Sequence, residues 1–324
     1  MTDPVHIPVL LDRIIALMAP ALDVPGAVVV DATLGLGGHA RALLEACPGA
    51  RLIGLDRDAA ALDLARTRLA PFAERVRFIE TVYDHLAEAV AETGWGPVRG
   101  VLFDLGLSSL QIDDPARGFS YSHDAPLDMR MSPQAGGMTA ADVVATYDQG
   151  ELIRVLRQYG DERFAARIAA AIVAARAKTP IATSAQLVEI VTAAIPVAAA
   201  RTGGHPAKRT FQALRMEVND ERGALVRALP QALDLIAPGG RLVVMSYHSG
   251  EDRLVKKVLT AATSDAVPHG LAVVPDHRRA RFHWLTRGAE QADEAEVAAN
   301  PRSASVRVRA VERHEESPGA VRGQ

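Results

Sequence analysis

The stretch Ala27-Val-Val-Val-Asp-Ala-Thr-Leu-Gly-Leu-Gly-Gly-His39 runs from a β-branched apolar segment through an acid into a glycine-rich turn. A β-branched run is typical of a buried strand, and glycines at the turn after it let a ligand approach the backbone closely. The helical pattern of residues 39–47 begins directly after the turn and offers unpaired backbone N–H groups there. The stretch therefore predicts a strand, a ligand-binding turn and a helix, which is the first unit of a nucleotide-binding α/β sheet.

The same rhythm continues outward from this stretch. A short apolar strand at Arg51–Asp56 again ends in an acid and is followed by a helix at Ala59–Leu69. Three more segments have the continuous apolar character of strands buried on both faces, and a short amphipathic helix at residues 9–18 precedes them all. These strands are expected at Val76–Tyr83, Val98–Asp104 and Arg241–Ser246. The alternation predicts a doubly wound parallel sheet of the α/β class.

The rhythm breaks between Gln111 and Pro206, where no strand is apparent. A loop at residues 117–137 and Ala-rich helical stretches at 151–177 and 184–194 make this connection too long for a βα loop. We expect an all-helical insertion, followed by a helix from Arg209 to Ile236 that returns to the sheet. The expected domains are residues 1–110 and 207–311 for the sheet, 111–206 for the insertion, and 312–324 for a flexible tail.

Composition narrows the class of protein. The chain has 324 residues, of which 48% are hydrophobic and 23% charged, as in an ordinary globular protein. Its single cysteine excludes a disulfide framework and a CxxC metal site. No secretory signal or apolar run of about 20 residues is present, so we expect a soluble, cytoplasmic protein without a membrane span. The oligomeric state stays open, with a homodimer among the alternatives.

The first group of candidate ligand-binding residues lies in the glycine-rich turn. Its spacing, Gly35-x-Gly37-x-x-Ala40, also fits the dinucleotide fingerprint, so the turn alone does not separate a nicotinamide enzyme from another nucleoside-binding protein. Asp31 favours the second, because a strand-end acid would hold a cationic group such as the amino group of S-adenosylmethionine and would oppose a pyrophosphate. The alternative role for Asp31 is a cap of the turn.

Two further candidates follow the second and third predicted strands. Asp56 is placed to accept both hydroxyls of an adenosine ribose. Its alternative role is the N-cap of the next helix, for which Asp58 is better placed. Tyr83 would lie beside an adenine ring, although an aromatic residue there is more often core packing.

The fourth and fifth strands end in polar residues that would face the same edge of the sheet. Asp104 follows the fourth strand, and Ser246-Tyr-His-Ser249 follows the fifth and suggests a substrate wall. A lone acid after a strand is also common as a turn residue. No GxSxG nucleophile elbow and no HExxH-like histidine pair occurs, which disfavours a serine hydrolase and metal catalysis.

The net charge of −3 does not by itself indicate a polyanion partner, but two stretches are locally basic. Residues 201–215 contain four basic residues and no acid, and residues 277–287 interleave arginines with Phe282 and Trp284. Such stretches fit either a nucleic-acid contact or an ordinary solvated surface.

Together these segments resemble the bacterial small-subunit ribosomal RNA cytidine-N4 methyltransferases, the RsmH or MraW family. The resemblance covers almost the whole chain and rests on long strings besides the glycine-rich turn. They are His6-Ile-Pro-Val-Leu-Leu11, Gly54-Leu-Asp-Arg-Asp58, Phe103-Asp-Leu-Gly-Leu-Ser-Ser109, Arg117-Gly-Phe-Ser-Tyr-Ser-His-Asp-Ala-Pro-Leu-Asp-Met-Arg-Met131, Lys208-Arg-Thr-Phe-Gln-Ala-Leu-Arg-Met-Glu-Val-Asn-Asp-Glu221, Ser246-Tyr-His-Ser249 and Asn300-Pro-Arg-Ser303.

The resemblance implies a Rossmann-like fold with a helical insertion and methylation, by S-adenosylmethionine, of the exocyclic N4 of a cytidine in the decoding region of 16S rRNA. The cofactor contacts carried over from it are Gly37, Gly38, His39, Asp56, Tyr83, Asp104 and Gln111. Two departures stand out: Gly250 replaces a larger apolar residue before Glu-Asp-Arg, which puts the local helix start in doubt, and Tyr83 replaces Phe.

Cytosine N4 is a poor nucleophile, so we hypothesise that Asp104 or a nearby backbone carbonyl accepts an N4 proton and aligns the lone pair. Phe119, Tyr121 or Tyr247 would stack on an extruded base. The two basic stretches, with Lys208 and Arg209 in the first, would grip rRNA phosphates, and Arg117, Arg130 and His248 are further substrate candidates. The rival hypotheses are a nicotinamide-dependent oxidoreductase, a non-catalytic ribosome-assembly factor, and a methyltransferase acting on DNA or protein.

Overall fold

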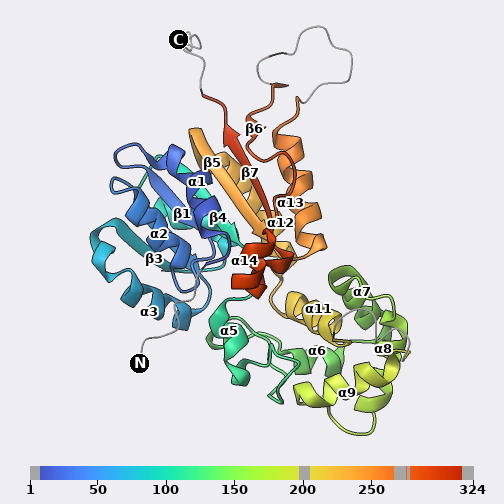
Figure 1. Ribbon diagram of the computed structural model, residues 1–324. Helices are drawn as coiled ribbons and strands as arrows, with labels where there is room; N and C mark the ends of the chain where they lie inside the picture. The colour runs from blue at the N-terminus through green and yellow to red at the C-terminus, as the bar shows by residue number, and fades with distance from the viewer. Residues whose placement is uncertain (1–7, 197–204, 266–274, 276–277, 316–324) are drawn as a thin grey trace. The chain divides into compact units, whose positions relative to one another are not determined.

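The computed structural model describes residues 8–196, 205–265, 275 and 278–315. The chain forms two compact units, a sheet unit made of Met1–Gly106 with Ala224–Gln324 and a helical unit made of Leu107–Gly223 (Figure 1). The helical unit thus extends beyond both ends of the expected insertion, residues 111–206.

The sheet has seven strands among the described residues, in the order β3-β2-β1-β4-β5-β7-β6. β1 to β5 pair in parallel, whereas β7 runs antiparallel to β5 and β6 runs antiparallel to β7. The strand bounds are β1 Val28–Asp31, β2 Arg51–Asp56, β3 Val76–Glu80, β4 Val98–Asp104, β5 Ile236–Ser246, β6 Phe282–Trp284 and β7 Arg307–Arg313. The predicted doubly wound α/β sheet is confirmed, with two antiparallel edge strands added.

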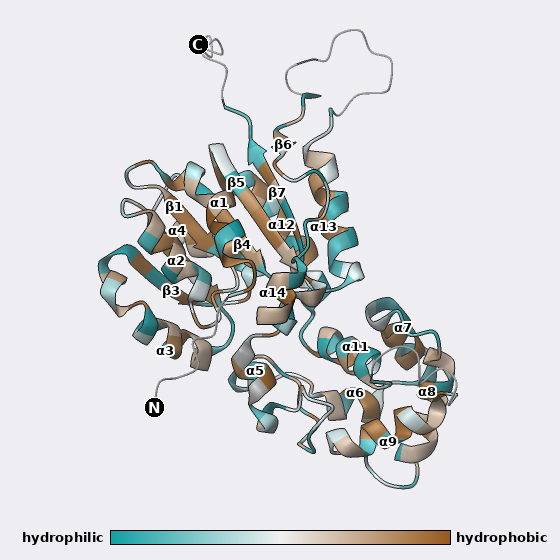
Figure 2. Cartoon of the chain, in the orientation of Figure 1, coloured by the Kyte–Doolittle hydropathy of each residue, from teal (hydrophilic) through white to brown (hydrophobic). Residues whose placement is uncertain are grey.

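Helices cover both faces of this sheet, because its central strands carry apolar side chains on both sides (Figure 2). Val29, Leu52 and Leu102 pack on one face with α1, α2 and α3. Val30, Ile53 and Phe103 pack on the other face with α4, α12 and α13. The helix bounds are α1 Leu11–Leu22, α2 Gly38–Ala46, α3 Ala59–Arg68, α4 Leu86–Thr93, α12 Glu221–Leu235, α13 Ser249–Ala262 and α14 Glu294–Ala299, with 3-10 turns η1 Ala70–Arg75, η2 Tyr83–His85 and η6 Pro301–Ser305.

The antiparallel edge corrects the expected flexible tail, residues 312–324, at its beginning. Glu312 and Arg313 belong to β7, and Glu312 accepts a hydrogen bond from Nε of Arg241 on β5 at 2.7 Å. Arg309 on the same strand is buried and pairs with Asp252 of α13 at 2.7 Å. A strand that buries an arginine lacks the apolar pattern by which the other strands were predicted, and residues 316–324 lie outside the described part of the chain.

The helical unit has a core of its own. The helices are α5 Ser109–Asp113, α6 Ala140–Thr146, α7 Gln149–Gly160, α8 Ala165–Arg176, α9 Ser184–Ala194 and α11 Lys208–Val218, with 3-10 turns η3 Pro115–Arg117 and η4 Pro133–Ala135. Four of them carry the capping box, in which an N-cap side chain and the third helical residue bond to each other's backbone N–H groups. The single helix expected over 151–177 is divided into α7 and α8 at Asp161, which has a φ of 47°.

The second helix boundary of the insertion also differs from the expectation. The helix predicted from Arg209 to Ile236 ends as α11 and restarts as α12, with Asp220 at a φ of 47° between them. Phe211 and Leu214 of α11 are buried in the helical core. α11 therefore belongs to the helical unit, whereas the sequence placed it in the second part of the sheet domain.

Candidate functional site

Three carboxylates lie at the carboxyl ends of neighbouring parallel strands: Asp31 on β1, Asp56 on β2 and Asp104 on β4. The strand order reverses between β1 and β4, and open α/β sheets bind ligands at this switch point. The carboxylates are close enough for the charges of Asp104 and Asp56 to raise the pKa of Asp31. The sequence prediction that these strand-end acids converge is thus supported by the geometry.

Asp31 is the most deeply buried of the three, with 2% of its surface exposed. Burial raises its pKa to about 7, with smaller contributions from Asp104 and Asp56, while a hydrogen bond from the N–H of Thr33 at 3.2 Å opposes the shift. Near neutral pH this carboxyl is balanced between its two protonation states. A cation placed beside it would favour the ionised state.

Asp56 ties the glycine-rich turn to the sheet. One carboxylate oxygen accepts the N–H of Gly35 at 2.8 Å, and the other accepts the N–H of Asp58 at 2.9 Å. Burial raises the pKa of Asp56 to about 6 against these hydrogen bonds. Asp58, not Asp56, caps α3 by accepting the N–H of Ala60 at 3.2 Å, which confirms that Asp58 is the better placed N-cap.

The glycines of the turn are required for different reasons. Gly35 and Gly37 have φ values of 51° and 73°, in the left-handed region that side chains disfavour. Gly38 begins α2, and a Cβ there would lie 2.5 Å from Cγ of Pro8. The chain's own packing therefore accounts for glycine at position 38.

Asp104 lies beside two side chains from other elements, and one of them donates a hydrogen bond to it. Its Oδ1 accepts the phenol O–H of Tyr247 at 2.7 Å, and its Oδ2 lies 3.5 Å from Nδ1 of His39. Nε2 of His39 is 3.0 Å from the carbonyl of Val9, an acceptor only, so this nitrogen carries the proton. Burial, with the charge of Asp104, raises the pKa of Tyr247 well above its usual value, and the phenol therefore stays a donor.

Glu251 in turn fixes Tyr247. Its Oε2 accepts the backbone N–H of Tyr247 at 2.9 Å, and its Oε1 lies 3.1 Å from Nε2 of His248. Nδ1 of His248 accepts the N–H groups of Gly250 and Glu251, so this ring is the N-cap of α13. The cap also removes the doubt about the helix start at Gly250. His248, proposed to meet the substrate, is used by the protein's own fold.

Two predicted cofactor residues, Tyr83 and Gln111, contact residues outside the three carboxylates. Tyr83, in η2 after β3, packs edge-on against Phe103 with ring centroids 5.6 Å apart. Gln111 lies in the helical unit, where its amide oxygen accepts the N–H of Ser108 at 3.1 Å in a capping box. Both residues have a structural role that accounts for their type.

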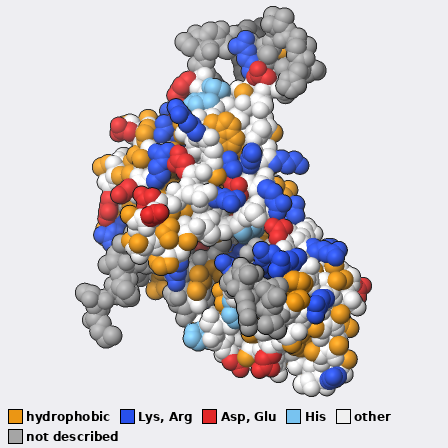
Figure 3. All heavy atoms as spheres, turned by 45° about the vertical axis from the view of Figure 1, so that its right-hand side comes forward, with side chains coloured by type: hydrophobic (Ala, Val, Ile, Leu, Met, Phe, Trp, Pro, Cys, Tyr) orange, Lys and Arg blue, Asp and Glu red, His pale blue; other side chains and the backbone are white. Residues whose placement is uncertain are grey.

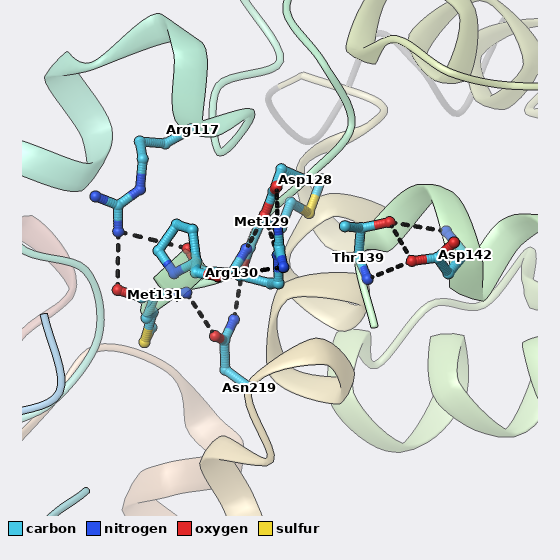
Figure 4. A network of polar contacts seen from close by, with 9 residues as sticks. Arg117, Asp128, Met129, Arg130, Met131, Thr139, Asp142 and Asn219 are labelled. Atoms are coloured by element: carbon cyan, nitrogen blue, oxygen red, sulfur yellow. Dashed lines mark hydrogen bonds and ion pairs between the residues drawn. The ribbon is translucent and has the colours of Figure 1, made fainter. Parts of the chain in front are cut away.

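The family-like string at 117–131 forms a braced loop in the helical unit (Figure 4). Asn219 donates to the carbonyl of Met129 at 2.7 Å and accepts the N–H of Met131 at 2.8 Å, and Met129 has a φ of 61°. Arg130 forms a two-pronged pair with Asp128, at 2.9 and 2.7 Å. Arg117 donates to the carbonyl of Met131 at 2.8 Å. Both arginines thus contribute to the loop itself.

The aromatic candidates for base stacking differ in availability. Phe119 is 8% exposed and part of the helical core. Tyr121 is half-buried and stacks on His205 with ring centroids 4.5 Å apart. In the second basic stretch, Phe282 is buried in the sheet core at 1% exposure. The alternation of arginine with aromatic residues there therefore reflects core packing at Phe282.

The cations of the two basic stretches also differ. Lys208 and Arg209 are exposed at the start of α11, whereas Arg281 pairs with Asp234 at 2.8 Å. Residues 201–204 and 277 lie outside the described part of the chain.

Sequence reasoning missed three residues that organise these sites. Thr33 accepts the backbone N–H of Asp104 at 2.7 Å and so joins the ends of β1 and β4. Glu251 and Asn219 are the other two. All three lie inside the quoted family-like strings or next to them, but only their partners, distant in sequence, reveal what they do.

Two absences apply to the described residues only. They contain no group of three or more His, Cys, Asp or Glu side chains that could hold a metal ion. Within the same ranges, no helix has the length and apolar character required to span a membrane.

Comparison with known proteins gives consistent matches. The model of the MraW methylase family matches residues 3–314. A protein named ribosomal RNA small subunit methyltransferase H from Acidothermus cellulolyticus is 59% identical over 309 residues, which are 95% of this chain and 94% of that protein. The protein of the same name from Thermobifida fusca is 56% identical over 97% of this chain and 94% of its own.

Solved structures are more distant. A putative rRNA methylase from Clostridium thermocellum aligns with a TM-score of 0.42 and 15% identity over 94% of each chain. A likeness at that level does not bear on function.

Proposed function

The chain belongs to the MraW methylase family, and on that premise we propose that it methylates the exocyclic N4 of a cytidine in the decoding region of 16S rRNA. The coarser statement, an S-adenosylmethionine-dependent methyltransferase of small-subunit ribosomal RNA, rests on the family and on relatives that share more than half of their residues with this chain. Membership of this family decides against the hypothesis of a nicotinamide-dependent oxidoreductase, which the glycine-rich turn alone had left open.

The observation that carries the cofactor assignment is the buried carboxylate cluster at the ends of β1, β2 and β4. S-adenosylmethionine is a cation at its sulfonium and its amino group, and it supplies an activated methyl group. Burial raises the pKa of Asp31 to about 7, so ionising this carboxyl costs free energy that a cation beside it would offset. The residues therefore fit this cofactor: Asp31 would hold its amino group, and Asp56 would accept hydrogen bonds from its ribose hydroxyls.

The remaining cofactor contacts are proposals of the same kind. Gly35, Gly37, Gly38 and His39 provide the close backbone approach beside Asp56. Tyr83, Asp104 and Gln111 complete the set implied by the family strings.

We propose that Asp104 accepts the proton that the cytidine N4 amino group loses. Methyl transfer would form the bond from N4 to carbon as the carbon–sulfur bond of the sulfonium breaks and leaves a thioether, and the N4 nitrogen would lose a proton to an acceptor. Oδ1 of Asp104 is engaged by Tyr247 at 2.7 Å, while the contact of Oδ2 with His39 is longer, 3.5 Å. Tyr247 thus fixes the carboxylate in place, and Oδ2 is the oxygen assigned to the N4 proton. A backbone carbonyl near Asp104 is the alternative acceptor.

For the RNA, we propose Lys208 and Arg209 as phosphate contacts, because both are exposed at the start of α11. Arg117 and Arg130 orient the substrate through the loop that they brace. Tyr121 and Tyr247 are the aromatic candidates for stacking on the base, since Phe119 is buried in the helical core. The proposed partner, the small ribosomal subunit, places the activity in the cytoplasm.

The test incubates small subunits from a strain lacking the endogenous enzyme with this protein and S-adenosylmethionine, and analyses digested rRNA by mass spectrometry. We expect N4-methylcytidine from the wild type. For Asp104→Asn we expect kcat at least about 100-fold lower, because proton acceptors contribute about that much. Tyr247→Phe removes one hydrogen bond to Asp104 and should lower kcat by about tenfold.

Full turnover by Asp104→Asn with normal cofactor affinity would contradict the role of Asp104 and favour a backbone carbonyl. Absence of N4-methylcytidine with intact cofactor binding would contradict the proposed acceptor. A non-catalytic assembly factor would bind subunits equally well with and without Asp104 and leave the rRNA unmodified.

A further inference from the structure

Five exposed cations gather where three helix ends of the helical unit meet. They lie near the end of α7, at the start of α8 and at the start of α11, and we call them the α7–α8–α11 basic surface: Arg157, Arg163, Arg167, Lys208 and Arg209. Figure 3 shows Lys and Arg side chains clustered on this part of the unit. Three of the five residues lie outside both basic stretches of the sequence.

Close helix packing brings these three ends together. Gly160, the last residue of α7, lies against α11 so tightly that a Cβ would be 2.6 Å from the carbonyl oxygen of Arg209. Arg209 donates to the carbonyl of Asp161 at 2.9 Å, and Gln212 donates to that of Tyr159 at the same distance. The start of α11 is thereby fixed on the end of α7, where Arg157 lies one turn before Gly160.

No described side chain neutralises the charges of this surface. None of the five cations forms an ion pair with any described residue, whereas Arg154 and Arg215 of the same unit pair with Glu217 and Glu221 at 2.7 Å. The nearest acid in sequence, Glu162, is buried and accepts the N–H of Phe164 at 2.8 Å. Asp161, next to it in sequence, is exposed.

The backbone adds to the same positive potential. α8 and α11 both begin at this surface, so the positive ends of their helix dipoles add to its potential; the carboxylate of Glu162 already accepts the N–H of Phe164, the N-cap of α8. The guanidinium of Arg163 lies 4.7 Å from the ring centroid of Phe164, which holds one cation over an aromatic face. Cations and helix N-termini together make an anion-binding surface.

We propose that the α7–α8–α11 basic surface binds the phosphodiester backbone of the RNA substrate. The proposal rests on the proposed function for the identity of the RNA and adds Arg157, Arg163 and Arg167 to its contacts. Phosphate is the anion that fits, because several separate cations spread over three helix ends match a repeating charge better than a single carboxylate. The contacts carry no base readout, since phosphate contacts position the protein and base contacts specify the sequence.

The test compares Arg157→Gln/Arg163→Gln/Lys208→Gln with the wild type in binding to naked small-subunit rRNA over a range of salt concentrations. Each phosphate contact contributes about 0.7 to 0.9 to the slope of log K against log salt. We expect the triple variant to lower the slope by about 2 to 3 and to bind at least about tenfold more weakly. In the methylation assay its KM should rise while kcat at saturation stays unchanged.

Lys178→Gln is the matched control. Lys178 is an exposed lysine of the same unit that follows the far end of α8, whose 12 residues span about 18 Å. We expect Lys208→Gln to lower the salt slope by about one and Lys178→Gln to leave it unchanged. Thermal unfolding of all variants should match the wild type, because only exposed side chains change.

Equal slopes for the triple variant and Lys178→Gln would overturn the proposal. So would weaker binding to assembled subunits with unchanged binding to naked rRNA, which would identify an acidic protein as the occupant. RNA binding that depends on this surface but yields no N4-methylcytidine would instead overturn the proposed function alone.

Discussion

The two units place their charged residues in opposite ways. The sheet unit buries acids: Asp31 and Asp56 lie at strand ends with pKa values raised to about 7 and about 6. The helical unit pairs its inner cations, as in Arg215 with Glu221, and leaves a group of cations exposed on the α7–α8–α11 basic surface. A buried acid without a cation is typical of a site for a small cationic ligand, and an exposed cation cluster is typical of a polyanion surface. The net charge of −3 hides this division.

The braced loop of the helical unit offers the largest expected effect on stability. Asn219→Ala removes the partner of three backbone groups, the N–H of Met131 and the carbonyls of Met129 and Arg215. We expect a loss of about 3 to 5 kcal/mol in the free energy of unfolding of this unit, because unpaired buried polar groups cost about 1 to 3 kcal/mol each. Chemical denaturation followed by hydrogen exchange of helical-unit amides measures it.

Asn300→Ala is the control for that change. Asn300 accepts the N–H of Arg302 within its own turn, in the sheet unit, so a loss of about 1 kcal/mol is expected. If Asn219→Ala costs no more than Asn300→Ala, the loop at 117–131 does not depend on the clamp and the contrast between the units weakens.

The stability of the sheet unit should depend on pH through the buried carboxyl of Asp31. The pKa of Asp31 is raised in the folded protein, so its stabilising contribution is present at low pH and is lost as the pH rises toward and through about 7. Asp31→Asn should therefore be more stable than the wild type at pH 8 by about 2 to 4 kcal/mol, at about 1.4 kcal/mol per pKa unit, and nearly equal to it at pH 4. Urea denaturation without cofactor at both pH values measures the difference.

The pKa of Asp252, in the same unit, is lowered, whereas that of Asp31 is raised. Burial tends to raise the pKa of Asp252, but Arg309 and Arg307 hold it below its usual value. Asp252→Asn should destabilise the protein at neutral pH, since Arg309 is left buried and unpaired. A stabilised Asp252→Asn, or an Asp31→Asn that is less stable than the wild type at pH 8, would contradict the assigned directions.

The sequence predicted the parallel part of the sheet well because each strand there is a continuous apolar run that ends in a polar residue. β2 and β4 have the bounds expected from Arg51–Asp56 and Val98–Asp104. The acids at their ends were identified for the same reason. Local pattern is sufficient where a strand is buried on both faces.

Contacts between distant residues decided what the sequence could not show. β7 was missed because Arg309 is buried only by virtue of Asp252, 57 residues earlier. His248 was expected at the substrate, yet its ring caps α13. The boundary of the helical unit moved to Gly223 because Phe211 and Leu214 pack into that unit's core. None of these partners can be read from spacing along the chain.

The cationic-ligand site at Asp31 is tested most directly by counting the protons released when S-adenosylmethionine binds. Calorimetric titrations at pH 6.5 in two buffers of different ionisation enthalpy give that number. Pairing with the amino group lowers the pKa of Asp31, so up to about one proton should be released by the wild type and fewer by Asp31→Asn. Binding enthalpies that are equal in the two buffers would contradict the assignment of Asp31 to the amino group of the cofactor.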